Sequence, residues 1–143
     1  MKKYLKKYMN CSLIYAVLAM IFGVFYREFT KFIGYTGHTV LSVVHTHYFM
    51  LGMIFFLILL LFEMNFTFSG KTMSKILIIY HTGLNLTVVM FLVRGILQTL
   101  QTPISAGINS AVSGIAGIGH ILLGVSIILV LVQLKKGIKD RLQ

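Results

Sequence analysis

The sequence has few of the charged residues that a soluble protein needs on its surface. Only three of its 143 residues are acidic, and all charged residues together make up 11% of the chain. Hydrophobic residues make up 57%, and the mean hydropathy is +0.89. This composition leaves no room for a soluble domain and indicates an integral membrane protein.

Other residue types are rare or absent as well. The single cysteine, Cys11, rules out an internal disulfide framework and a cysteine metal cluster. Tryptophan is absent, so an aromatic belt at the membrane surface must consist of tyrosine and phenylalanine. The only proline, Pro103, marks a turn rather than a break within a span.

The hydrophobic residues fall into four runs, each long enough to cross about 30 Å of hydrocarbon as a helix. We therefore predict an all-α integral membrane four-helix bundle that forms one domain over residues 1–143. Lys6 and Lys7 extend the charged N-terminal segment and no small-residue cleavage site follows, so we expect the first run to be retained. The predicted spans are residues 10–26, 38–62, 76–100 and 108–134.

The cations predict the orientation of these spans. Only Arg27 and Lys31 fall in the loops of one side, and the positive-inside rule makes the other side cytoplasmic. We expect a multi-pass protein of the plasma membrane, with both termini in the cytoplasm. The net charge of +10 then suits anionic lipid headgroups rather than nucleic acid. The cations of the cytoplasmic side are Lys2, Lys3, Lys6, Lys7, Lys71, Lys75, Lys135, Lys136, Lys139 and Arg141.

Histidines inside the predicted spans are the main functional candidates, because ionisable groups are costly in a membrane. His45 and His47 are two residues apart on one helix, so they point about 200° apart and cannot share one metal ion. Each can serve a separate site. The alternative is that both histidines are hydrogen-bonded to carbonyls or hydroxyls of neighbouring helices.

A third histidine and an arginine lie at related depths. By helical rise, His45 and His47 lie roughly 10–15 Å, His120 roughly 15–18 Å and Arg94 roughly 8–10 Å below the outer edges of their spans. This arrangement suits heme, whose iron takes axial imidazoles and whose anionic propionates need cations. The expected metal ligands are His45, His47 and His120, and the expected propionate partners are Arg94 and Arg27.

Purely structural roles, without a bound cofactor, remain open for several of these residues. Arg94 could form a salt bridge to Glu28 or cap a carbonyl, and Arg27 could contact headgroups. The small residues before His120, which include Gly114 and Gly117, suit close helix packing as well as a flat ring. Two further residues receive structural predictions: we expect His81 to be a hydrogen-bonded core histidine and Glu63 to face cytoplasmic water.

The segment Val43-Val44-His45-Thr46-His47-Tyr48-Phe49-Met50-Leu51-Gly52 resembles the histidine-bearing helix of heme-copper oxidase subunit I. In that family, a His-x-His helix ligates two different hemes from its two faces. The whole chain also resembles an uncharacterised family of small bacterial four-helix membrane proteins. The oxidase subunit contains three four-helix units, so the resemblance implies a homotrimer of twelve helices, with His45 and His47 as heme ligands.

The departures from that family limit what the resemblance implies. No adjacent histidine pair exists for a copper site, so oxygen reduction is not expected. No Cys-x-x-Cys-His segment exists, so covalent heme attachment is not expected either. The sequence therefore favours a b-type heme protein for electron transfer or gas-ligand binding, with a quinone or a redox protein as partner. The alternatives are a histidine-lined proton or metal-ion transporter and a cofactor-free structural subunit.

Overall fold

The computed structural model describes residues 2–143 and consists of helices joined by three short loops. All four membrane segments exceed the roughly 20 residues that a membrane crossing needs. The predicted all-α fold is thus confirmed, with four helices that are long and apolar enough to span a membrane. The segments are α1 (Lys2–Ile33), a second segment from Val40 to Asn65, α4 (Lys71–Thr99) and α5 (Ala106–Leu142).

The second segment is not a regular helix. It begins with a 3-10 turn, continues as one turn of α-helix, widens into a π-helix and returns to α-helical geometry. Its predicted histidine helix is therefore short and lies between two irregular pieces. These pieces are η1 (Val40–Val43), α2 (Val44–His47), η2 (Tyr48–Ile54, the π-helix) and α3 (Phe55–Asn65).

The helix ends follow local capping chemistry. Gly34 has a φ of 69°, and the bonds from Gly34 N to Lys31 O and from Tyr35 N to Thr30 O close α1 in the manner of a Schellman motif. The end of α4 repeats the pattern with Gln101 at a φ of 51°. Pro103 lies in the loop that follows, as the sequence predicts.

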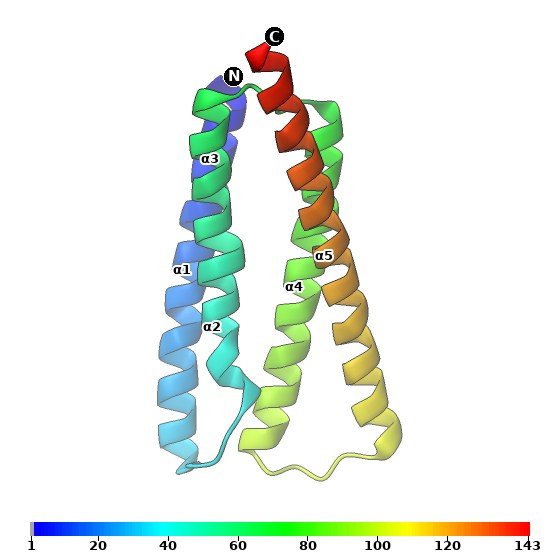
Figure 1. Ribbon diagram of the computed structural model, residues 1–143. Coiled ribbons are helices and arrows are strands. Elements are labelled where there is room, and N and C mark those ends of the chain that lie inside the picture. Colours follow the sequence, from blue (N-terminus) through cyan, green and yellow to red (C-terminus); the bar gives the residue numbers. More distant parts are fainter. Residues whose placement is uncertain (1) are drawn as a thin grey trace.

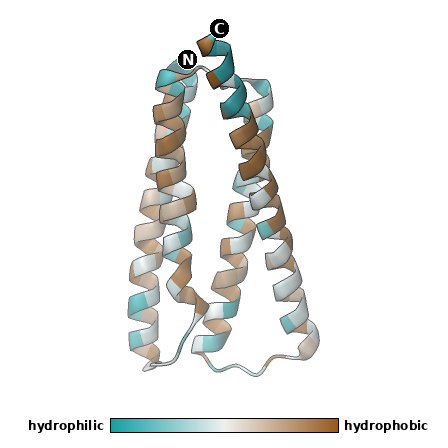
Figure 2. Cartoon of the chain, viewed as in Figure 1, coloured by the Kyte–Doolittle hydropathy of each residue, from teal (hydrophilic) through white to brown (hydrophobic). Residues whose placement is uncertain are grey.

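Two helix pairs make up the molecule (Figure 1). One pair is α1 with the second segment, and the other is α4 with α5. Both termini lie at one end, opposite the loops that follow α1 and α4. Figure 2 shows apolar residues along all four helices and hydrophilic residues gathered at the end that carries the termini.

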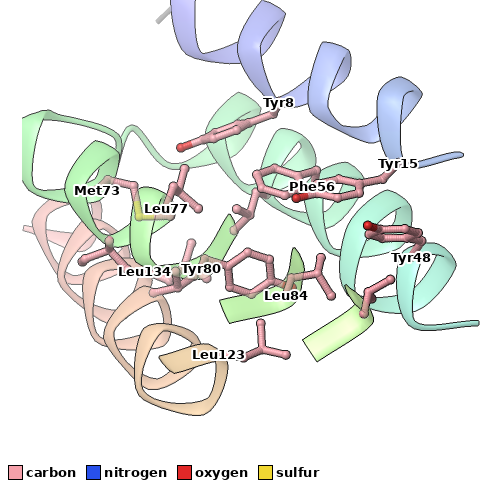
Figure 3. Close-up of a cluster of buried hydrophobic side chains, with 14 of the residues drawn as sticks. Tyr8, Tyr15, Tyr48, Phe56, Met73, Leu77, Tyr80, Leu84, Leu123 and Leu134 are labelled. Carbon is pink, nitrogen blue, oxygen red and sulfur yellow. The ribbon is translucent and has the colours of Figure 1, made fainter. Parts of the chain in front are cut away.

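A core rich in aromatic residues holds the two pairs together (Figure 3). Tyr15 of α1 stacks on Phe56 of α3 with ring centres 5.9 Å apart, and Tyr80 of α4 stacks on Phe55 at 4.2 Å. Large apolar side chains on the outer faces of all helices stay exposed, as expected where lipid covers them. The aromatic core thus fixes α1, α3 and α4 relative to one another.

Candidate functional site

The start of the second segment is fixed on α4. Thr39 Oγ1 donates to the carbonyl of Gly95 at 3.0 Å, and the amide of Val40 donates to Gln98 Oε1 at 2.9 Å. A Cβ at Gly95 would lie 2.5 Å from Cγ of Leu41, so only glycine permits this approach. This anchor sets the direction in which the next helical turn presents its histidines.

His45 faces α1. Its Cβ and Cγ lie 3.7 Å from the place where a Cβ on Gly23 would stand, and its ring meets Phe49 edge-on with centres 6.5 Å apart. The Nδ1 atom of His45 is buried and has no hydrogen-bond partner among the described residues. An imidazole nitrogen left without a partner in an apolar environment is costly and so marks His45 as a functional candidate.

His47 faces the other way, towards α4. Its ring meets Phe91 nearly at a right angle, with centres 4.9 Å apart. Its Nδ1 lies 2.8 Å from the carbonyl oxygen of Val43, one turn earlier in the same segment. His45 and His47 therefore contact different helices, as their spacing of two residues requires.

His120 of α5 repeats the arrangement of His47. Its Nδ1 lies 2.8 Å from the carbonyl oxygen of Ala116, and its ring lies 5.6 Å from that of Phe91. Phe91 thus contacts both imidazoles, one from the second segment and one from α5. His47 and His120 thus both lie beside Phe91, whereas His45 faces α1.

The hydrogen bonds of His47 and His120 determine where each ring carries its proton. A carbonyl oxygen can only accept, so Nδ1 of each ring must be the protonated donor. Nε2 then keeps its lone pair and is the atom free to bind a metal. A bond from Nδ1–H to a backbone carbonyl is also the usual way in which proteins orient a metal-binding imidazole.

The surface of α5 beside His120 is open. His120 is itself exposed, and a Cβ added at Gly114, Gly117 or Gly124 would meet nothing within 4 Å. Gly119 differs, because a Cβ there would lie 2.5 Å from Thr87 Oγ1 of α4. Gly119 therefore serves helix packing, whereas the other three glycines line a free face.

Arg94 belongs to the α4–α5 pair and Arg27 does not. Nη2 of Arg94 donates to Asn109 Oδ1 at 3.1 Å and to Ser113 Oγ at 2.5 Å, so it does not form the salt bridge to Glu28 considered from the sequence. It also donates to the Asn109 carbonyl at 3.3 Å. Arg27 lies exposed on α1, where it pairs with Glu28 at 3.6 Å.

The π-helix that follows His47 is held by side chains of neighbouring helices. Ser12 Oγ of α1 donates to the carbonyl of Met53 at 3.0 Å, and the Tyr80 hydroxyl of α4 donates to the carbonyl of Leu51. Gly52 lies against Tyr15 so closely that an added Cβ would stand 2.5 Å from its Cβ. π-helical turns often occur at functional sites, and this one joins the histidine turn to the aromatic core.

A polar network inside the helices is the feature that sequence reasoning missed. His81 is hydrogen-bonded as predicted, with Nδ1 2.6 Å from the Tyr15 hydroxyl. Asn85 Nδ2 donates to that hydroxyl at 3.1 Å, and Asn85 Oδ1 accepts from Tyr48 at 2.9 Å. One signal was available, because His81 and Asn85 are four residues apart and so share a helix face.

The prediction for Glu63 was wrong. The residue is 0% exposed rather than in water, and its Oε2 accepts from the amides of Phe68 at 3.3 Å and Ser69 at 3.1 Å. The chain turns back over the end of α3, so the carboxylate completes the loop that leads to α4. Its Oε1 has no partner among the described residues.

Over residues 2–143, no group of three or more histidine, cysteine, aspartate or glutamate side chains is close enough to hold a metal ion. A bare zinc ion at a structural site takes four protein ligands, and even a catalytic one takes three. Heme differs, since it needs only axial ligands from the protein. Two imidazoles beside Phe91 are therefore too few protein ligands for such a zinc site, whereas two is the number of axial positions on a heme iron.

These features are those of a multi-pass membrane protein in which an imidazole of the second segment and an imidazole of α5 both contact Phe91 of α4. The chain belongs to the family described as "Protein of unknown function (DUF2871)", whose model matches residues 5–137. No curated protein and no solved structure matches the chain. The resemblance to heme-copper oxidase subunit I stays a prediction from the histidine segment alone.

Proposed function

We propose that the protein is a membrane-embedded b-type heme protein in which His47 and His120 supply the axial ligands of one iron. The observation that carries the proposal is the shared state of these two imidazoles. Each donates Nδ1–H to its own helix at 2.8 Å, which leaves Nε2 free, and each contacts Phe91. Placing two imidazoles with the same free nitrogen in membrane segments is energetically unfavourable, so helix packing alone does not account for them.

The surroundings of His120 also fit a large flat group. The open glycines at 114, 117 and 124 leave space beside it that bulkier side chains would fill. Arg94 lies on the same helix pair and its guanidinium is already turned towards α5, where it could meet a propionate. Arg27, on α1, is a weaker candidate because it is exposed and already paired.

The ligand set favours electron transfer over gas binding. Two histidine ligands fill both axial positions of the iron, whereas a gas ligand needs one of them open. When bound, the heme would supply one-electron chemistry, and the protein would set its potential through these ligands and the nearby charge of Arg94. His45, with its unpartnered Nδ1 on the opposite face, is the residue left for a second site.

The proposal includes assembly and orientation. His120, Asn109 and Ser113 are exposed polar residues on the face of α5 that a single chain leaves open to lipid. Polar side chains in a membrane face protein or a cofactor, so a homo-oligomer that covers this face is favoured. The oxidase resemblance makes a homotrimer the leading choice. The lysine distribution favours an orientation with both termini in the cytoplasm, and we propose the plasma membrane as the location.

One observation favours a proton-conducting function as the second candidate. Tyr48, Asn85, Tyr15 and His81 form a continuous chain of hydrogen bonds within the membrane segments. The Tyr15 hydroxyl and the His81 imidazole are groups that can exchange a proton, and Asn85 orients the hydroxyl. This alternative predicts proton flux in liposomes and no heme spectrum, whereas a cofactor-free structural subunit predicts neither.

A heme titration tests the proposal. Purified protein is titrated with hemin, and the Soret band is followed for the unmodified chain, His47→Ala, His120→Ala and the control His38→Ala, which changes an exposed histidine of the loop after α1. The proposal predicts one heme per chain, with affinity reduced at least tenfold in the two ligand variants only. Equal titrations for all four proteins, or no saturable binding by any, would overturn it.

A further inference from the structure

A second polar site lies between α1 and α4, on helix faces that do not contact α5. It is a pocket of about 320 Å³, and its walls come only from these two helices. Cys11 and His81 lie about 6 Å and 9 Å along their helices from the nearest lysines, Lys7 and Lys75, so the pocket belongs to the apolar part of the spans. The lining residues are Cys11, Ile14, Tyr15, Leu18, His81 and Asn85.

The hydrogen bonds around Tyr15 determine the proton position on His81. Asn85 Nδ2 donates to the Tyr15 hydroxyl oxygen, which leaves the hydroxyl hydrogen free to donate to His81 Nδ1 at 2.6 Å. Since that hydrogen has no other acceptor among the described residues, His81 Nδ1 is the acceptor and Nε2 carries the proton. This tautomer is the reverse of the one that His47 and His120 adopt.

The proton on Nε2 of His81 has no good acceptor. The nearest polar atom is Sγ of Cys11 at 3.9 Å, and sulfur is a weak acceptor. Phe56 stacks on the imidazole with ring centres 5.0 Å apart and nearly parallel planes, which fixes the direction of the N–H bond. Cys11 also lines the pocket, so the Nε2–H donor of His81 is available to a ligand that lies beside Cys11.

We infer that this pocket binds the headgroup of a membrane quinone. A quinone is a flat apolar ring with carbonyl oxygens that accept hydrogen bonds, and His81 offers one oriented donor among apolar walls. The pocket is formed by two helices only, so it opens towards lipid, where quinones reside. Soluble ligands and bare metal ions match it less well, because its walls include Ile14, Leu18 and the tyrosine ring.

This inference rests on the proposed function, because reduced heme would give a bound quinone an electron donor. A quinone that becomes a quinol gains two electrons and two protons. Reduced heme would supply the electrons one at a time, so two hemes would each give one, or one heme would be reduced again between the two steps. His81 Nε2–H gives one proton to a quinone carbonyl oxygen, and His81 receives a proton at Nδ1 from the Tyr15 hydroxyl. Water supplies the second proton and the proton that restores Tyr15.

The test uses 2-heptyl-4-hydroxyquinoline N-oxide, a fluorescent quinone analogue, with protein in lipid nanodiscs and empty nanodiscs as the partition control. Quenching of the probe measures binding. We expect saturable binding of one probe per chain, weakened about tenfold in His81→Phe, which corresponds to one lost hydrogen bond. Leu18→Trp fills the pocket without touching the polar network and should weaken binding at least as much.

The controls separate this inference from the proposed function. Thr82→Val changes the exposed neighbour of His81, whose hydroxyl bonds only to its own helix, and should bind the probe normally. His47→Ala should lose heme but keep the probe. Probe binding that is no better than in empty nanodiscs, or that is unchanged in both His81→Phe and Leu18→Trp, would overturn the inference while leaving the heme titration valid.

Discussion

Gly52 lies so close to the Tyr15 side chain that the π-helix has no room for a side chain of its own at this point. A Cβ at Gly52 would stand 2.5 Å from both Cβ and Cγ of Tyr15, atoms that cannot move without moving α1. The contact matters beyond packing, because Tyr15 also bonds to His81 and Asn85. The shape of the second segment and the polar network are therefore linked through this glycine.

We expect Gly52→Ala to lower the free energy of unfolding by about 1–3 kcal/mol, as overpacking a close contact does. Thermal unfolding of the heme-free protein in detergent would measure it. Gly124→Ala is the matched control, because nothing lies within 4 Å of a Cβ there. If both variants unfold at the same temperature, the close contact between α1 and the π-helix is not present.

Glu63 gives a prediction about the loop between α3 and α4. In Glu63→Leu, the amides of Phe68 and Ser69 lose their acceptor, which costs about 1–3 kcal/mol for each group left unpaired. Glu63→Gln keeps one acceptor oxygen and should be tolerated much better. Limited proteolysis at the loop, together with thermal unfolding, would distinguish the two variants, and equal sensitivity would contradict the assigned role.

Gln101 offers a substitution that should stabilise the protein. It adopts a φ of 51° at the end of α4, a conformation that costs an L-residue roughly 1–2 kcal/mol and glycine almost nothing. Gln101→Gly should therefore raise the unfolding temperature. The same change at the neighbouring exposed Gln98 removes a helical side chain that bonds to Val40, and should lower it.

Much of the fold could be predicted from the sequence, because apolar runs and cation positions follow from the membrane itself. The π-helix could not, since its residues are as hydrophobic as those of a regular span and the side chains that bond to its carbonyls, Ser12 and Tyr80, lie on other helices. The burial of Glu63 was mispredicted for a related reason. A carboxylate at the end of a span normally meets water, and only the returning loop buries it.

In the candidate site, too, some features could be predicted from the sequence and others could not. The spacing of His45 and His47 predicts that they face different helices, and the structure places them so. That Phe91 contacts both His47 and His120 depends on how α5 packs on α4, which no local pattern reveals. The network around Tyr15 was missed because its members come from three separate helical segments.

The charge of Arg94 should tune the proposed heme. Removing a cation near the iron makes reduction harder, because positive charge stabilises the reduced form. We expect a lower midpoint potential in Arg94→Met than in the unmodified protein, measured by a spectroscopic redox titration. Arg27→Met, which alters an exposed and paired arginine, should change the potential less. An equal shift in both variants would argue against a role specific to Arg94.

Electron paramagnetic resonance of the ferric, heme-loaded protein tests the central claim most directly. Iron held by two imidazoles gives a low-spin signal, and loss of one imidazole gives a high-spin signal. The account predicts a low-spin signal for the unmodified protein that becomes high-spin in His120→Ala. A high-spin signal in the unmodified protein, or a low-spin signal that survives in both His47→Ala and His120→Ala, would contradict it.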